Sequence, residues 1–164
     1  MNFNIRAMND GDGPAVLAIY GEGIAGGNAT FDRDVPSWES WDSKFLKCCR
    51  LIAESVDRKV MGWTAIQPVS KRECFSGVAE VSIYLSSAAH GLGIGRALLN
   101  RLINESEENG YWTLQSGIFP ENRASLTLHF NLGFREVGRR EKFGQMNGVW
   151  RDVILLERRS TIVG

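Results

Sequence analysis

The chain has 164 residues, 43% of them hydrophobic, and its 19 basic and 19 acidic residues cancel. This length supports one domain that buries roughly 70% of its unfolded surface. The even charge balance gives no global electrostatic reason to bind nucleic acid or an anionic membrane. The N-terminus lacks the apolar core of a signal peptide, and no run approaches the ~18 apolar residues of a membrane helix. We therefore expect neither a nucleic acid nor a membrane as partner.

The cysteine and histidine content bears on location and metal binding. Cys48, Cys49 and Cys74 are odd in number and two of them are adjacent, which suggests reduced thiols in a cytoplasm. Only His90 and His129 are available and no Cys-x-x-Cys occurs, so we expect no metal site.

The first half of the chain predicts a strand, two helices and a hairpin. Glycines at 26 and 27 end the first helix, and Ser37 is placed to N-cap the second, which carries Trp38, Trp41, Phe45 and Leu46. A loop at 28–36 joins the two helices. The expected elements are a strand at 3–6, helices at 16–25 and from 37, and strands at 51–54 and 60–67.

The second half predicts a strand at 78–85, a helix that stops near Asn109-Gly110, a strand at 111–119 and a helix at 122–131. Two last strands, 134–140 and 149–157, are expected to pair across a loop at 144–148. No internal repeat or linker interrupts the pattern. The element order, βααββ, βαβα, ββ, predicts one α/β domain over residues 1–164, an α+β fold with a mixed sheet.

Three glycines on alternate positions, Gly91, Gly93 and Gly95, separate the strand at 78–85 from its helix. Glycine lets the backbone turn sharply and expose its N–H groups, and the positive end of the helix dipole adds to a cradle for phosphate. A plain strand-to-helix turn explains the same pattern equally well. The Rossmann and Walker fingerprints do not fit, because Arg96-Ala97 stand where a Walker motif has Lys-Ser/Thr.

The run His-Gly-Leu-Gly-Ile-Gly at 90–95 resembles the acetyl-CoA loop of the GCN5-related N-acetyltransferases (GNAT), Gln/Arg-x-x-Gly-x-Gly/Ala, with His90 as a departure. Residues 122–134 continue the match, and Ala-Glu-Val-Ser-Ile-Tyr at 79–84 and the ending at 143–152 narrow it to the phosphinothricin and methionine-sulfone acetyltransferases. The resemblance implies the GNAT fold, acetyl-CoA as co-substrate, and transfer of acetyl to the α-amino group of a small amino acid or analogue. It also implies a cytoplasmic homodimer.

Two residues are candidates for proton transfer. Acyl transfer needs a neutral amine, and Glu80, which matches the catalytic glutamate of the family, can take its proton. Desolvation in an apolar strand would help a carboxylate to accept that proton. Strand alternation alone also allows Glu80 to face solvent. His129 falls where this branch carries a histidine, so the resemblance makes it a candidate acid for the thiolate; the alternative is a packed side chain on a helix face.

The resemblance also assigns the cofactor contacts. The backbone of Leu85 is expected to pair with the pantetheine arm, as in strand addition. The pyrophosphate is expected to lie on Gly91, Gly93, Ile94, Gly95 and Arg96, where a cation in the first helical turn is unfavourable unless an anion is bound. Asn122 is expected to bond the pantetheine amide, with Ser125 one turn on. His90 either contacts phosphate or points to solvent while the backbone binds the ligand.

Substrate recognition is open within this reading. Arg33, Lys71 or Arg72 are candidates to pair with a substrate carboxylate, although each is as simply an ordinary loop charge. Phe31 and Tyr84 are candidate walls, and the resemblance gives Trp150 a dimer contact and a site wall. Two other function classes stay open: a peptide or protein N-terminal acetyltransferase, and a CoA-binding regulator without turnover.

Overall fold

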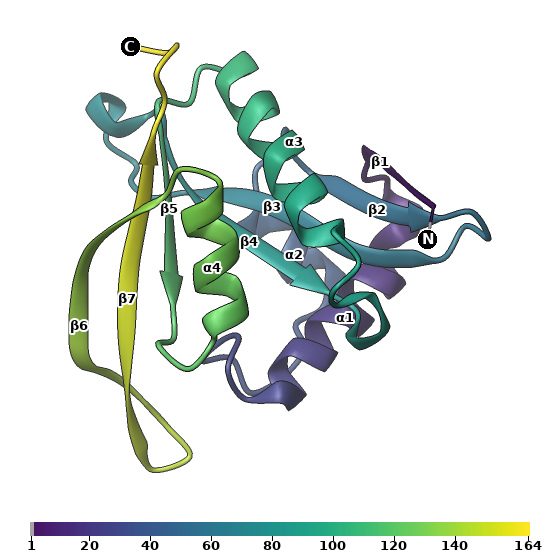
Figure 1. Cartoon of the computed structure of the whole chain (residues 1–164), viewed down its shortest axis with the longest axis horizontal. Coiled ribbons are helices and arrows are strands. Elements are labelled where there is room, and N and C mark those ends of the chain that lie inside the picture. Colours follow the sequence, from purple (N-terminus) through teal and green to yellow (C-terminus); the bar gives the residue numbers. More distant parts are fainter. Residues whose placement is uncertain (1) are drawn as a thin grey trace.

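A computed structural model describes residues 2–164 of the chain. Seven strands form one mixed sheet in the order β1-β2-β3-β4-β5-β7-β6 (Figure 1). The strands are β1 (Phe3–Ala7), β2 (Leu51–Ser55), β3 (Val60–Pro68), β4 (Val78–Leu85), β5 (Thr113–Ile118), β6 (Arg135–Met146) and β7 (Val149–Arg159). The helices are α1 (Gly13–Gly26), α2 (Trp38–Lys44), α3 (Ile94–Glu108) and α4 (Arg123–Asn131), with short 3-10 turns at Asp10–Asp12, Glu73–Phe75 and Ser87–Ala89.

The element order and the mixed sheet confirm the predicted fold, and the main changes of bounds are in three elements. The second helix ends at Lys44, so Phe45 and Leu46 follow it. The fifth strand is shorter than 111–119 at both ends. The sixth strand runs to Met146, so the last hairpin turns at Asn147-Gly148, both with positive φ, rather than across a loop at 144–148. Bulges keep β6 paired with β7 past the predicted end of the strand.

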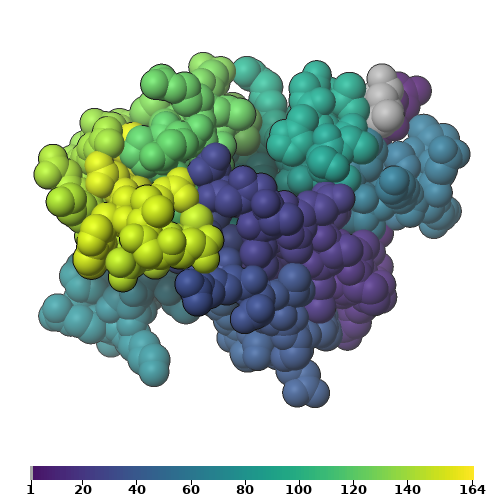
Figure 2. All heavy atoms as spheres, turned by 90° about the horizontal axis from the view of Figure 1, so that it is seen from below, coloured from purple at the N-terminus to yellow at the C-terminus, as the bar shows by residue number. Residues whose placement is uncertain are grey.

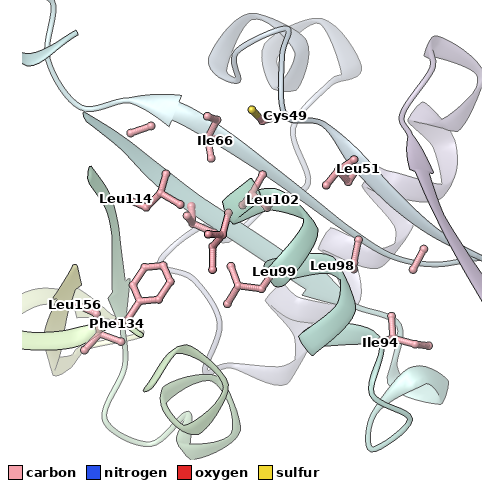
Figure 3. Close-up of a cluster of buried hydrophobic side chains, with 14 of the residues drawn as sticks. Cys49, Leu51, Ile66, Ile94, Leu98, Leu99, Leu102, Leu114, Phe134 and Leu156 are labelled. Atoms are coloured by element: carbon pink, nitrogen blue, oxygen red, sulfur yellow. The ribbon is translucent and has the colours of Figure 1, made fainter. Parts of the chain in front are cut away.

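Two hydrophobic cores flank the sheet. One lies under α3, whose apolar positions recur at helical spacing, and Figure 3 shows Leu98, Leu99 and Leu102 in one cluster with Leu51, Ile66 and Leu114 of the sheet. The other lies under α1 and α2 and holds an aromatic group in which the Trp41 and Trp63 rings meet edge to face at 5.2 Å. Burying each large apolar side chain contributes roughly 1.5–3 kcal/mol, so both faces of the sheet are anchored.

Candidate active site

The site begins where two neighbouring strands separate. β4 and β5 are the parallel pair of the sheet, and their register covers three positions and ends at Glu80 opposite Gln115. Beyond that point the strands diverge, as Figure 1 shows, and residues 81–85 have no strand partner on that edge in the described chain. The divergence leaves room for a ligand between β4 and β5 and exposes a strand edge along it.

A groove of about 540 Å³ lies over the C-terminal end of β4, between α1, α3 and α4. Its lining includes every predicted cofactor residue except Ile94. The lining residues among those predictions are Leu85, His90, Gly91, Gly93, Gly95, Arg96, Asn122 and Ser125. The Ile94 side chain is instead buried in the α3 core, so that residue has only its backbone to offer a ligand.

The three glycines of the loop serve two different purposes. Gly91 and Gly93 have φ of 76° and 79°, the left-handed region that side chains disfavour, and Gly93 is the N-cap of α3. No protein atom lies within 4 Å of a Cβ built on either, so the space above the loop is open. Gly95 is helical, and a Cβ there would come 3.3 Å from Leu128 Cδ2, so its small size serves packing. The open loop and the 15-residue helix behind it fit an anion such as a pyrophosphate.

Asn122 lines the groove, but its side chain is already hydrogen-bonded at both ends. Its Oδ1 accepts a bond from the Ser125 N–H at 3.3 Å, which caps α4, and its Nδ2 donates to the Asn28 carbonyl at 3.1 Å. The second N–H of Nδ2 has no partner among residues 2–164, so the predicted bond from Asn122 to a pantetheine amide stays a prediction. Local sequence patterns do not reveal the contact with Asn28, because the two residues are 94 positions apart.

A second cavity of about 300 Å³ lies at the point where β4 and β5 separate, and Glu80 lines it. Glu80 is half-buried, and its role as a base stays a prediction. Gln67 Nε2 donates to Glu80 Oε2 at 2.7 Å and Gln115 Nε2 donates to Oε1 at 3.3 Å. Both amides are the direct cross-strand partners of Glu80, and together they orient its carboxylate toward the cavity.

His129 lines the same cavity and is buried, with 1% of its surface exposed. Its Nδ1 lies 2.7 Å from the Ser125 carbonyl oxygen, which can only accept, so Nδ1 carries the proton and Nε2 is a lone-pair acceptor. Nε2 has no hydrogen-bond partner among residues 2–164. Burial lowers the pKa of His129 below its usual value of 6.5, which favours the neutral ring at pH 7. This geometry favours an accepting Nε2, and the predicted acid role of His129 stays a prediction.

Aromatic side chains wall the cavity on the α1 side. Tyr84 stacks on Trp63 at 5.0 Å, and Tyr20 meets Tyr84 edge to face at 4.8 Å. The Tyr20 hydroxyl donates to the Asp32 carboxylate, and burial raises the pKa of Tyr20 to about 12. Both phenols therefore stay neutral, and the wall carries no charge of its own.

The loop between α1 and α2 closes the cavity against the β6–β7 hairpin, and Figure 2 shows these two segments in contact. Phe31 of this loop meets Phe119 edge to face at 4.8 Å, and a Cβ on Gly144 would come 2.6 Å from its ring. Arg151 of β7 donates to the Gly27 carbonyl at 3.0 Å and to Asn28 Oδ1 at 2.7 Å. Phe31 and Tyr84 both line the cavity, as the sequence predicted for its walls.

The structure places the other predicted substrate contacts outside both linings. Arg33 donates to Asn147 Oδ1 at 3.4 Å, Arg72 lies 5.3 Å from the Phe75 ring centroid, and Lys71 is exposed beside it. Trp150 is 56% exposed on β7. Within one chain these four residues therefore contribute neither a carboxylate contact nor a wall to the cavity.

The cavity lining also includes polar residues that the sequence analysis missed. One is Gln67, one of the two amides that hold Glu80, and two are the cations Lys44 and Arg140; Gln115, the other amide, lies outside the lining. For Arg140 the sequence offered only a weak signal, its position in a predicted strand. The face of the sheet on which Arg140 lies depends on how that strand pairs with β7. Within residues 2–164 no group of three His, Cys, Asp or Glu side chains is arranged to hold a metal ion. No helix in the same part of the chain is long and apolar enough to cross a membrane.

Comparison with known proteins agrees with this geometry. Residues 24–134 match the model of the acetyltransferase (GNAT) family. The chain is 28% identical to an L-methionine sulfoximine/L-methionine sulfone acetyltransferase from Pseudomonas aeruginosa, over 96% of this chain and 94% of the relative.

Two solved structures superpose on nearly the whole chain. A phosphinothricin acetyltransferase from Sinorhizobium meliloti, solved in complex with AcCoA, has a TM-score of 0.89 at 27% identity, covering 97% of this chain and 89% of that one. A ribosomal-protein-alanine N-acetyltransferase from Brucella melitensis has a TM-score of 0.86 at 32% identity, covering 96% and 99%. With its ordered motifs, its strand divergence and its glycine loop, the chain belongs to the acetyltransferase (GNAT) family.

Proposed function

We propose that the protein transfers acetyl from acetyl-CoA to the α-amino group of a small amino acid or amino-acid analogue of the phosphinothricin or methionine-sulfone type. The observation that carries this is the meeting of the groove and the cavity. Both are lined by Asn28, Ala29, Ile83, Tyr84, Asn122 and Ser125. A cofactor laid along the groove therefore reaches the cavity that holds Glu80.

The groove residues fit the cofactor in two respects. The open loop at Gly91 and Gly93 offers backbone N–H groups to the pyrophosphate, and the unpartnered edge of residues 81–85 offers a strand partner to the pantetheine arm. Arg96 adds a positive charge in the first turn of α3. When bound, acetyl-CoA supplies the activated acetyl thioester.

In the cavity, Glu80 acts as the general base. Most amines carry a proton at pH 7, and the nitrogen has no lone pair for attack until that proton leaves. The Glu80 carboxylate takes the proton directly or through a water, while Gln67 and Gln115 keep it aimed at the cavity. His129 lies in the same lining with an unprotonated Nε2, placed to accept a hydrogen bond from a reacting group.

The assembly and location belong to the same proposal. We infer a homodimer, with the exposed apolar residues at the β6–β7 hairpin, Phe143, Val149 and Trp150, partly covered by a second copy. The three cysteines are free thiols, which fits a reducing cytoplasm.

A thiol-release assay with acetyl-CoA tests the function. The acceptors are phosphinothricin, methionine sulfone, a panel of natural amino acids and a short peptide with N-terminal alanine. Release with amino acids and not with the peptide supports the proposal, and mass spectrometry of the product confirms an N-acetyl group. Release with the peptide alone favours the second candidate function, a protein N-terminal acetyltransferase. The similarity to the Brucella melitensis structure supports this candidate. No release with any acceptor overturns both.

A further inference from the structure

The charges around the cavity are unbalanced. Lys44 and Arg140 line it as cations, and Glu80 lines it as the carboxylate. His129 is buried, and its burial lowers its pKa, which favours the neutral ring. Asp32 is outside the lining and accepts a bond from Tyr20. An amino acid with one carboxylate leaves one of the two lining cations without a counter-charge.

Arg140 is aimed into this cavity by the pairing of β6 with β7. It lies opposite Val153, and directly paired residues share one face of a sheet. Val153 is buried and lines the cavity, so that face is the cavity face. The register then breaks between Arg140 and Gly144, with Lys142 at φ 46°, and such a bulge redirects the side chains beside it.

The guanidinium of Arg140 is available for a ligand. It lies 4.8 Å from the centroid of the Phe143 ring, which packs it without neutralising it. Arg140 makes no salt bridge or side-chain hydrogen bond with any of residues 2–164. Its neighbour Arg139 differs in this respect: Arg139 alternates to the other face and pairs with Asp152 at 2.7 Å. Arg139 is therefore held by an ion pair, whereas Arg140 lines the cavity with its guanidinium unpaired within residues 2–164.

We propose that Arg140 binds an acidic group at the side-chain end of the acceptor, so that the enzyme prefers amino acids with a second acidic group over neutral ones of the same shape. A planar guanidinium pairs with a carboxylate or phosphinate through two parallel hydrogen bonds. Glu80 serves the amine, and Lys44 supplies the charge for the α-carboxylate. This inference rests on the proposed function and names the acceptor class for that same site.

The test compares glutamate with glutamine, which differ by one acid group at nearly constant shape. The wild-type protein is expected to show a kcat/KM for glutamate at least about tenfold above that for glutamine. Arg140→Met should lower this ratio by about 10- to 100-fold, the effect of losing charge-assisted hydrogen bonds. Arg140→Lys should keep part of the preference. Arg139→Met, a change of the same size on the opposite face, should leave the ratio unchanged.

A binding measurement separates the inference from the function. Titration calorimetry of glutamate into the protein saturated with CoA needs no turnover. If no amino acid is acetylated, the proposed function fails, yet glutamate binding that Arg140→Met abolishes and Arg139→Met keeps still supports the role of Arg140. Three results overturn the role of Arg140. The first is an equal kcat/KM for glutamate and glutamine, and the second is a ratio that Arg140→Met leaves unchanged. The third is a protein that neither acetylates amino acids nor binds glutamate.

Discussion

Replacing Glu80 by glutamine tests the base at the centre of the site. Gln67 and Gln115 both donate to the wild-type carboxylate, at 2.7 and 3.3 Å. A glutamine at 80 has one acceptor oxygen and one NH2 group, so one of the two partners must rotate its own amide to accept. Both partners are amides and each has an oxygen to offer, so the variant should fold with a stability change of about 1 kcal/mol or less.

The catalytic loss should be far larger than this structural cost. Removing a positioned general base lowers kcat/KM by about 10²–10⁴ at pH 7. The loss should narrow toward pH 9, because a larger fraction of the acceptor's α-amino groups is then neutral without help. CoA affinity should change little, because Glu80 lines the acceptor cavity and not the cofactor groove.

The assay is the pH–rate profile of wild type and Glu80→Gln from pH 6 to 9 with the best acceptor. Glu136→Gln is the control, because Glu136 is an exposed carboxylate on β6 outside both linings. A rise in KM with kcat unchanged would assign Glu80 to substrate binding instead. Matching profiles for wild type and Glu80→Gln would refute the reasoning, and the proton would have to leave by another group or by water.

Three further results are expected. Burial lowers the pKa of His129 in the folded state, so as the pH drops the unfolded chain binds the proton first. The free energy of unfolding should therefore fall as the pH drops below about 6.5. In His129→Gln, the free energy of unfolding measured by urea denaturation should depend less on pH between 7 and 5. Gly93→Val forces a side chain into φ +79°, which costs about 1–2 kcal/mol. Calorimetry should show CoA binding weakened about tenfold or more, with the fold retained. The control Gly138→Val, in open space and without positive φ, should not weaken CoA binding. Sedimentation equilibrium at micromolar protein should show a dimer that Trp150→Asp weakens, and a single 18.3 kDa species throughout would contradict it.

The features of the site that depend on residues close together in the sequence could be predicted from it. The glycine loop is set by its own backbone, and the positive φ of Gly91 and Gly93 is a conformation that glycine adopts without strain. Alternation along β4 puts Glu80 on the same face as Tyr84, which packs against the α1–α2 core, and opposite Val81, which is buried in the α3 core. Element order and fold class follow from the same local patterns.

The parts that depend on distant pairing were not predicted. Arg33 and Arg72 are as basic as Arg140, and only the packing of loops against the sheet decides which of them borders the cavity. The register of β6 against β7 shifts twice, and no local pattern shows on which face Arg140 lies after such shifts. The fixed amide of Asn122 belongs to the same class, since its partner is on the loop between α1 and α2.

Three residues in one row across the sheet position the candidate base. Gln67 of β3, Glu80 of β4 and Gln115 of β5 lie opposite one another, and Glu80 and Gln115 form the last pair before β4 and β5 separate. One position earlier, the side chain would point to the other face of the sheet. A position past the divergence would have no β5 partner to hold it. Position 80 meets both conditions, being fixed by two strands and open to a ligand. A one-residue slip of β4 would turn the carboxylate into the α3 core, so the strand register determines whether Glu80 borders the cavity at all.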